Sequence, residues 1–304
     1  MKVLITGGAG FIGSHIVELL QDKAEVVVLD NLRTGYMRNI APFAKTTFIS
    51  GSICDRDSVR RAMRGVDCVF HLAALISVPE SMEKIQECID INGKGLLNVY
   101  EAAAEAGVKK LVFSTSAAIY GDNPVVPKIE TMHPEPKSPY AVTKLDGEYY
   151  AKMFTDLGRL NVACLRYFNV FGPRQDPNSA YAAAVPIFIE RALKNLPITI
   201  YGDGEQTRDF IFVKDIAAAN WFMAQNDATG VFNVAYGGRQ TINELVETII
   251  RLTGSKSEVT HAPDRAGDVK HSMADVSRLK ATGFVPQYTF AEGLRQTIEF
   301  FKSK

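Results

Sequence analysis

The feature that most limits the fold of this chain is a short apolar run near its start that gives way first to glycines and then to a helix. Residues Lys2–Thr6 (KVLIT) have the β-branched character of a buried strand, and Gly7, Gly10 and Gly13 follow directly. A helical stretch then spans residues 11–22. In such a βα turn, glycines allow close approach of a pyrophosphate, and the helix N-terminus offers it unpaired N–H groups. The sequence therefore predicts dinucleotide binding at this turn.

The alternation of apolar runs and helical stretches continues through the first half of the chain. The runs are apolar on both faces, which is typical of parallel strands covered by helices on two sides. We therefore expect an α/β fold with a doubly wound parallel sheet, that is, a Rossmann domain. The expected strands are Lys2–Thr6, Glu25–Asp30, Thr47–Ser50, 68–72, 110–114 and 161–166, and the expected helices are 11–22, 57–64, 85–106 and 140–157.

Prolines and glycines become frequent after about residue 169, and the strand-like pieces become shorter. We expect the Rossmann domain to span residues 1–168 and a smaller mixed α/β lobe to span residues 169–304. This lobe is expected to pack over the C-terminal edge of the sheet and to be interrupted, with some segments returning to the first domain. Its expected helices are 185–195, 213–225, Ile242–Thr253 and 291–301, and its expected strands are Ile198–Tyr201, 231–234 and 258–261.

Composition excludes several classes of protein. Lys+Arg and Asp+Glu both number 34, so the chain has no net charge to attract nucleic acid or an anionic membrane. No apolar run is long enough to span a bilayer. The four cysteines form no CxxC pair and the histidines show no HxxxH spacing, so we expect reduced cysteines, no metal and a cytoplasmic location.

Asp30 ends the second expected strand and bears on the choice of cofactor. A carboxylate at this position can accept hydrogen bonds from both adenosine ribose hydroxyls and would repel a 2′-phosphate. Asp30 therefore favours NAD over NADP. The alternative is that Asp30 is an ordinary helix cap or turn residue.

A second motif begins at Ser138, which can cap a helix whose first residue is Pro139. Tyr140 and Lys144 then lie four residues apart on one helix face. An ammonium group close to a phenol lowers its pKa from about 10, so Tyr140 is predicted to act as a base that Lys144 tunes. Lys144 could also bind the nicotinamide ribose. The alternative is a chance pair on a helix surface.

Together with the Gly-x-x-Gly-x-x-Gly turn, the Tyr140–Lys144 pair resembles the extended short-chain dehydrogenase/reductase family, and the resemblance covers nearly the whole chain. It implies that Ser116, in the segment STSAAIYG, is the hydroxyl of a catalytic triad with Tyr140 and Lys144. The alternative for Ser116 is a turn hydroxyl that binds its own backbone. The implied cofactor contacts are Gly7, Gly10, Phe11, Ile12, Gly13, Asp30, Asn31, Ser52, Ile53, Leu72, Ala73, Ala74, Tyr140, Lys144 and Tyr167.

Ala117 and Ala118, which follow Ser116, limit the reactions that the chain could catalyse. Dehydratases of the family resemble this chain but carry Asp-Glu here, and decarboxylases place a Glu nearby. The resemblance therefore implies a UDP-sugar 4-epimerase that oxidises C4 to a transient 4-keto sugar, reduces it again and keeps NAD tightly bound. The alternatives are another nucleotide-sugar oxidoreductase or dehydratase of the family, and an NAD-sensing or scaffolding protein on the same fold.

The substrate contacts implied by the resemblance lie mostly in the second lobe. The segments Thr-Arg-Asp-Phe and Arg-Ala-Gly-Asp resemble family segments whose arginines clamp the diphosphate, a task that suits guanidinium groups. The alternative for each arginine is a surface ion pair. The implied substrate residues are Ser116, Asn169, Val185, Tyr201, Arg208, Arg265, Asp268 and Ser272.

Ser272 bears on the C2 substituent of the sugar, because strict glucose/galactose epimerases carry a large tyrosine at the matching position. A serine there should leave room for a 2-acetamido group, whereas Ile76 is bulky where the N-acetyl branch can have glycine. We expect interconversion of UDP-GlcNAc and UDP-GalNAc, with UDP-Glc and UDP-Gal also used. A strict UDP-glucose/UDP-galactose 4-epimerase is the alternative. The resemblance also implies a homodimer formed through helices 85–106 and 140–157.

Overall fold

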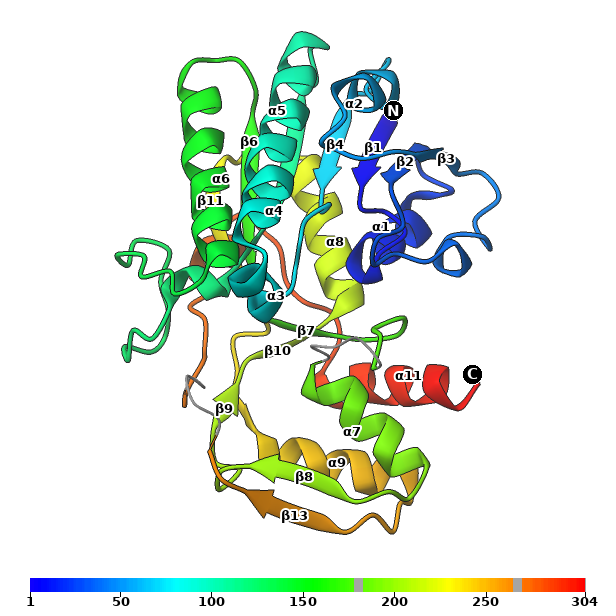
Figure 1. The fold of residues 1–304 in the computed structure, drawn as a ribbon, viewed down its shortest axis with the longest axis vertical. Helices are drawn as coiled ribbons and strands as arrows, with labels where there is room; N and C mark the ends of the chain where they lie inside the picture. The colour runs from blue at the N-terminus through cyan, green and yellow to red at the C-terminus, as the bar shows by residue number, and fades with distance from the viewer. Residues whose placement is uncertain (178–182, 265–269, 304) are drawn as a thin grey trace.

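The centre of the molecule is a parallel sheet whose strands run in the order β11-β6-β5-β4-β1-β2-β3 (Figure 1). The computed structural model describes residues 1–177, 183–264 and 270–303. Strand order reverses between β1 and β4, so the predicted doubly wound sheet is confirmed. The strands are β1 (Lys2–Thr6), β2 (Glu25–Asp30), β3 (Thr47–Ser50), β4 (Cys68–His71), β5 (Lys110–Ser116), β6 (Val162–Tyr167) and β11 (Gly230–Val234).

Alternating side chains on each strand bury two separate cores, one on each face of the sheet. Val3 and Ile5 of β1 belong to the core beneath α1 (Phe11–Leu20) and α8 (Val213–Ala224). Leu4, between them, belongs to the opposite core, which is covered by α2 (Arg56–Ala62), α5 (Leu96–Glu105) and α6 (Pro139–Asp156). Because both faces are covered, the strands are apolar throughout, as the sequence indicated.

The predicted helix 85–106 is not continuous in the structure. It consists of α4 (Ile85–Ile89), a π-helical segment η2 (Asp90–Gly95) and α5, and the short helix α3 (Val78–Glu83) precedes it. Gly95 lies in the wider turn, where a Cβ would lie only 2.8 Å from the Ile53 side chain. The π-helical turn carries Asn92, whose buried contacts lie beside the candidate site.

The second lobe lies beyond the carboxyl ends of the strands, toward which the arrows in Figure 1 point. Its own core joins side chains of α7 (Ala184–Leu193), α9 (Ile242–Thr253) and α11 (Phe290–Lys302). Three two-stranded sheets complete the second lobe as the structure describes it. They join β7 (Asn169–Phe171) to β10 (Phe210–Phe212), β8 (Ile198–Tyr201) to β13 (Val259–Ala262), and β9 (Thr207–Arg208) to β12 (Gln240–Thr241).

Two elements from the second half of the sequence pack with the first half. β11 pairs with β6 as an edge strand of the main sheet, and α8 packs beside α1. The predicted boundary between residues 168 and 169 stays a prediction. The remaining short helices are η1 (Met37–Asn39), η3 (Ala117–Tyr120) and α10 (Ser277–Ala281).

The four cysteines are free. In the part of the chain that the structure describes, no helix combines the length and the apolar character needed to cross a bilayer.

Candidate active site

The turn between β1 and α1 forms a cradle that only glycines fit. Gly7 has φ +73°, and a Cβ on it would lie 2.8 Å from the backbone nitrogen of Ala73. A Cβ on Gly13 would lie 2.2 Å from the carbonyl oxygen of Gly7. Within the described residues, no side chain caps α1 at Gly10 and no acid lies in its first turn. The first N–H groups of α1 are therefore available to an anion, and this cradle fits the pyrophosphate of a dinucleotide.

Asp30, at the end of β2, is joined directly to this turn. Its Oδ2 atom accepts a hydrogen bond from the Ala9 N–H (2.9 Å), and its Oδ1 atom accepts one from the Leu32 N–H (2.8 Å). Each carboxylate oxygen keeps a further lone pair. Asp30 therefore holds the glycine turn and can still accept hydrogen bonds from ribose hydroxyls.

The other predicted cofactor residues share one property, which is that each lies at or just after a strand end or opens α1. Because the strands are parallel, these positions meet along a single edge of the sheet. The Tyr167 hydroxyl donates a hydrogen bond to Asn220 of α8 (3.0 Å), so that group is already engaged. Phe11 and Ile12 open α1, Asn31 follows β2, Ser52 and Ile53 follow β3, Leu72, Ala73 and Ala74 follow β4, and Tyr167 ends β6.

The structure brings the three predicted triad residues together at the same edge. Ser138 caps α6 by accepting the Ala141 N–H (3.2 Å), which places Tyr140 and Lys144 on the first two turns. Ser116 ends the neighbouring strand β5. The side chains of Ser116 and Tyr140 are hydrogen-bonded to each other.

Lys144 is almost fully buried, and its Nζ atom donates a hydrogen bond to the Ser114 carbonyl oxygen (2.7 Å). Burial lowers the pKa of Lys144 to about 8. Burial also raises the pKa of the Tyr140 phenol, while the Ser116 hydrogen bond opposes that rise. The expected lowering of the Tyr140 pKa by Lys144 is thus not found here, because the ammonium is directed at the backbone of β5.

Two buried residues that sequence reasoning missed fix the ends of β1 and β4. The Thr6 hydroxyl and the His71 Nδ1 atom lie 2.7 Å apart, and the Ala73 N–H donates to the same hydroxyl (3.3 Å). The His71 ring stacks on Phe113, and burial lowers the pKa of His71 to about 3, so the ring is neutral. The sequence feature that could have revealed them is a polar residue at the C-terminal end of each of two largely apolar strands.

Asn92 was also missed, although it organises the loop after β4. Its amide accepts the Leu75 N–H (2.7 Å) and donates to the Leu75 carbonyl (3.0 Å). It also donates to the hydroxyl of Thr143, the neighbour of Lys144 (3.1 Å). Asn92 therefore ties the loop that carries the predicted cofactor residues Ala73 and Ala74 to the helix that carries Tyr140 and Lys144. An amide followed by Gly93 and Gly95 in an otherwise helical stretch was the available signal.

Three predicted substrate residues gather around the segment Thr207–Asp209. Arg208 lies on β9, where its Nη1 atom donates to the Thr207 carbonyl (2.9 Å). The Ser272 N–H donates to the same carbonyl (3.1 Å). The Asn169 amide donates to the Asp209 carbonyl (3.4 Å). Arg208, Ser272 and Asn169 therefore share one backbone segment.

The remaining predicted substrate residues are placed differently. Tyr201 is 40% exposed at the end of β8, whereas Val185 points into the core of the second lobe, so only its backbone could reach a ligand. Arg265 and Asp268 lie outside the described residues.

Asp209, the neighbour of Arg208, is the buried acid that holds this segment in place. Its carboxylate accepts the N–H groups of Tyr236 (3.1 Å), Gly237 (3.2 Å) and Ala274 (3.1 Å). Burial outweighs these hydrogen bonds and raises the pKa of Asp209 to about 6. Asp209 thus joins Arg208 to the end of β11 and to the segment that contains Ser272. Sequence reasoning missed it because its partners are distant in sequence.

Comparison with known proteins shows the family of this chain. The model of the NAD dependent epimerase/dehydratase family matches residues 3–235. This match covers most of the chain, including the glycine turn, Ser116, Tyr140 and Lys144. The chain belongs to the NAD dependent epimerase/dehydratase family.

Three solved structures are similar to this chain along its whole length. A UDP-N-acetylglucosamine 4-epimerase from Methanobrevibacter ruminantium, in complex with UDP-N-acetylmuramic acid, is 44% identical with a TM-score of 0.96, over 99% of this chain and 98% of that one. A UDP-glucose 4-epimerase from Thermotoga maritima, with UDP-glucose, is 38% identical with a TM-score of 0.95, over 100% of this chain and 99% of that one. A UDP-glucose 4-epimerase from Thermus thermophilus, in complex with NAD, is 40% identical with a TM-score of 0.91, over 99% of each chain.

These likenesses confirm the predicted reaction class, an NAD-dependent UDP-sugar 4-epimerase, which is an isomerase. They leave the preferred sugar open, because the similar proteins include both N-acetylglucosamine and glucose epimerases.

Proposed function

We propose that this chain interconverts UDP-GlcNAc and UDP-GalNAc and also UDP-Glc and UDP-Gal. The observation that carries the proposal is the position of Ser272, which shares the Thr207 carbonyl with Arg208. If Arg208 binds the substrate diphosphate, a small side chain at 272 leaves space for the sugar's C2 substituent. The likeness to a UDP-N-acetylglucosamine 4-epimerase supports the same preference. A strict UDP-Glc/UDP-Gal epimerase is the alternative.

In the proposed mechanism, Tyr140 takes the proton of the C4 hydroxyl and later returns one. Ser116 is hydrogen-bonded to Tyr140 and can share that proton during transfer. Lys144 is mostly protonated at pH 7, because its pKa is about 8. Its ammonium lies beneath the site, 5.8 Å from the centre of the Tyr140 ring, and would bind the nicotinamide ribose. NAD, when bound, supplies the acceptor and donor of the C4 hydride.

The proposed residues bind the cofactor and the UDP part of the substrate firmly and the hexose loosely. The glycine turn and Asp30 hold the cofactor, and Arg208 and Arg265 hold the diphosphate of the substrate. Asn169 bonds a phosphate oxygen, while Asp268 and Tyr201 hold the uridine. Fewer contacts are assigned to the hexose, so a 4-keto sugar can turn over and present its opposite face.

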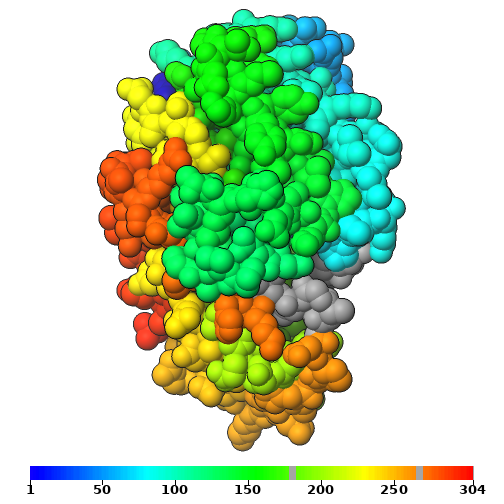
Figure 2. Space-filling model, turned by 90° about the vertical axis from the view of Figure 1, so that its left-hand side faces the viewer, coloured from blue at the N-terminus to red at the C-terminus, as the bar shows by residue number. Residues whose placement is uncertain are grey.

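The proposal includes a homodimer formed through α4, α5 and α6. Figure 2 views the side of the molecule on which α6 lies, and the residues of α6, coloured green, are at its surface. Val142, Tyr149 and Met153 are exposed on α6, at spacings that place them along one helix face. Ile85 and Ile89 of α4 are also exposed. A cytoplasmic location belongs to the same proposal, and free cysteines are typical of a reducing compartment.

The decisive experiment offers UDP-GlcNAc and UDP-Glc separately to the purified protein without added NAD, with the products resolved by NMR. Formation of UDP-GalNAc supports the proposal. Formation of UDP-Gal alone keeps the mechanism and favours the strict epimerase, with Ile76 closing the C2 pocket. No product from either substrate, even with NAD added, contradicts the proposed function.

A further inference from the structure

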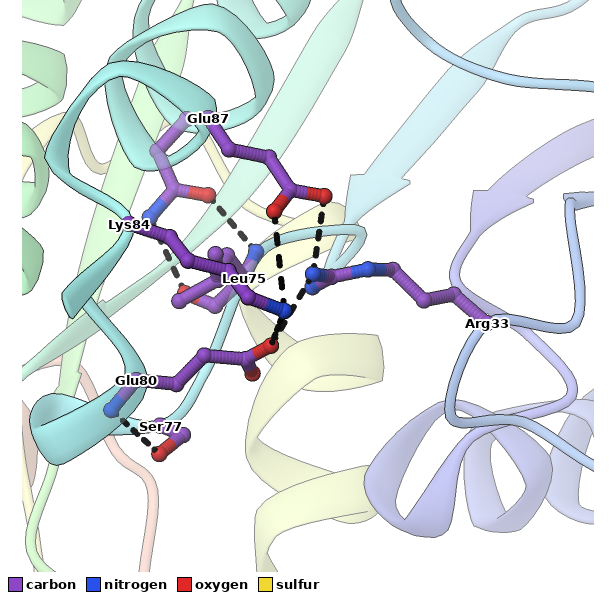
Figure 3. Close-up of polar contacts among 7 residues, drawn as sticks. Arg33, Leu75, Ser77, Glu80, Lys84 and Glu87 are labelled. Atoms are coloured by element: carbon purple, nitrogen blue, oxygen red, sulfur yellow. Dashed lines mark hydrogen bonds and ion pairs between the residues drawn. The ribbon is translucent and has the colours of Figure 1, made fainter.

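A network of four charged side chains crosses from the loop after β2 to helices α3 and α4. The Nη2 atom of Arg33 donates to Glu80 Oε1 (3.1 Å) and to Glu87 Oε1 (2.9 Å). The Nζ atom of Lys84 donates to Glu80 Oε1 (3.0 Å) and lies 3.9 Å from Glu87 Oε2. Figure 3 shows Arg33 reaching from its loop on the right to the two glutamates on the left. We name these four residues the Arg33 bridge.

The Arg33 bridge spans the part of the sheet edge where the cofactor is proposed to lie. Strands β2 and β4 flank β1 on either side, so the loops that follow them flank the glycine turn. Arg33 belongs to the loop that begins after Asp30, and α3 follows the loop that contains Ala73 and Ala74. A dinucleotide lying on the glycine turn would therefore pass between the two ends of the bridge.

Both ends of the bridge are tied to the loops that carry the proposed cofactor residues. On one side, the Arg33 N–H donates to the Asn31 side chain (3.1 Å). On the other, Ser77 caps α3 by accepting the Glu80 N–H (3.1 Å), and Asn92 holds the neighbouring Leu75. Movement at either end is thus transmitted to those loops.

We propose that the Arg33 bridge is a strap over the bound NAD that slows its release, with Arg33 acting as a positioning residue. The inference rests on the proposed function, in which one NAD molecule stays bound through repeated turnovers. Two acids and two bases leave the bridge without net charge. It therefore retains the cofactor by holding the loops together, not by attracting the pyrophosphate.

The side chains of the bridge are partly exposed, 27% for Arg33, 22% for Glu80 and 44% for Glu87. Ion pairs of this kind are individually weak and are screened by salt. We therefore expect the loss of the bridge to accelerate NAD release by about threefold to fivefold at low ionic strength. The difference should shrink at about 1 M salt.

The test measures the rate at which the purified holoenzyme exchanges its bound NAD for an excess of isotopically labelled NAD. Arg33→Met and the double variant Glu80→Gln with Glu87→Gln should both accelerate exchange, since each removes both ion pairs of Arg33. Arg56→Met is the matched control, because Arg56 pairs with Glu101 on α2 and α5, away from both loops. Its exchange rate should equal that of the parent.

A different pattern would assign Arg33 another role. If Arg33 binds the pyrophosphate directly, Arg33→Met accelerates exchange whereas Glu80→Gln with Glu87→Gln does not, and the strap is overturned. Unchanged exchange in both variants also overturns it. The double variant Arg33→Glu with Glu87→Arg restores an opposite-charge pair, so slow exchange should return if the bridge itself matters.

Failure of the strap and failure of the proposed function give distinguishable results. A parent protein that neither retains NAD nor epimerises a UDP-sugar contradicts the function. A parent that retains NAD and epimerises, with variants that release NAD at the same rate, contradicts the strap alone. Urea unfolding of each variant shows whether a faster exchange reflects a less stable fold.

Discussion

The Nζ atom of Lys144 lies 2.7 Å from the carbonyl oxygen of Ser114 and 5.8 Å from the centre of the Tyr140 ring. The backbone of β5 thus fixes the ammonium beneath the site, and Tyr140 itself contacts Ser116. This arrangement separates two tasks. In the proposed mechanism, Ser116 shares a proton with Tyr140, while Lys144 contributes charge and holds a ribose of the cofactor.

We expect Tyr140→Phe to retain NAD and UDP-sugar binding but to lower kcat by about 10²- to 10⁴-fold, because the variant has no hydroxyl to move the proton. Single-turnover epimerisation and calorimetric binding of UDP measure the two effects separately. Tyr149→Phe, on the exposed face of the same helix, is the control and should keep full activity. Near-normal turnover by Tyr140→Phe would refute the proposed base.

Ser272→Tyr should reduce kcat/KM for UDP-GlcNAc by at least about tenfold more than for UDP-Glc, since the larger side chain would fill the proposed C2 space. Ser272→Ala removes the hydroxyl without adding bulk and should leave the ratio of the two substrates close to that of the parent. An equal loss for both substrates in Ser272→Tyr would show that position 272 does not sense the C2 substituent.

Asp209→Ala should lower the free energy of unfolding by about 3–5 kcal/mol, because it leaves several backbone N–H groups without their buried acceptor. Urea unfolding measures this loss. Asp203→Ala is the control, since Asp203 is exposed and accepts a single local hydrogen bond, and its loss should stay below about 1 kcal/mol. Equal stability of the two variants would mean that Asp209 does not hold this segment.

His71 should make the stability of the protein depend on pH in the acid range. Its pKa is about 3 when folded and 6.5 when unfolded, so between these values the unfolded chain binds more protons. The contribution of His71 is therefore full above pH 6.5 and decreases as pH falls, by about 1.4 kcal/mol per pH unit. Asp209, with a folded pKa of about 6 against 3.8, acts in the opposite direction between those two values.

The His71 contribution can be isolated by comparison with His71→Asn. The free energy by which this variant is destabilised at pH 7 should shrink by about 2–3 kcal/mol at pH 4.5, where the parent has lost that much of the His71 contribution. Urea unfolding at the two pH values measures the change. His133→Asn alters an exposed histidine and is the control. A destabilisation by His71→Asn that is independent of pH would contradict a buried neutral ring.

Much of the fold could be predicted because its signals are local. The runs Lys2–Thr6 and Glu25–Asp30 are β-branched and end at turn residues, and the structure has strands with those same bounds. The helix cap at Ser138 likewise placed Tyr140 and Lys144 on one helix face. The break at Asp90–Gly95 could not be predicted, because it depends on Asn92 reaching a loop that the apolar spacing does not reveal.

The parts of the site that sequence reasoning missed depend on distant partners. Asp209 looks like any acid beside an arginine, and its role appears only when residues 236, 237 and 274 converge on it. The predicted direction of the shift in the Tyr140 pKa was wrong for the same reason. Helical spacing places Lys144 near Tyr140, but the Ser114 carbonyl on another strand decides where the ammonium points.

The hydrogen bond from Ala9 to Asp30 has a consequence for how an enzyme of this kind could change its coenzyme. In its proposed role, Asp30 rejects a 2′-phosphate, yet the same carboxylate fixes the backbone of the turn that receives the pyrophosphate. Replacing it with a small neutral residue would open room for NADP and at once leave the Ala9 N–H without its acceptor. The preference for NAD and the geometry of the pyrophosphate-binding turn thus both depend on the Asp30 carboxylate. A switch to NADP would require a second substitution to hold the turn.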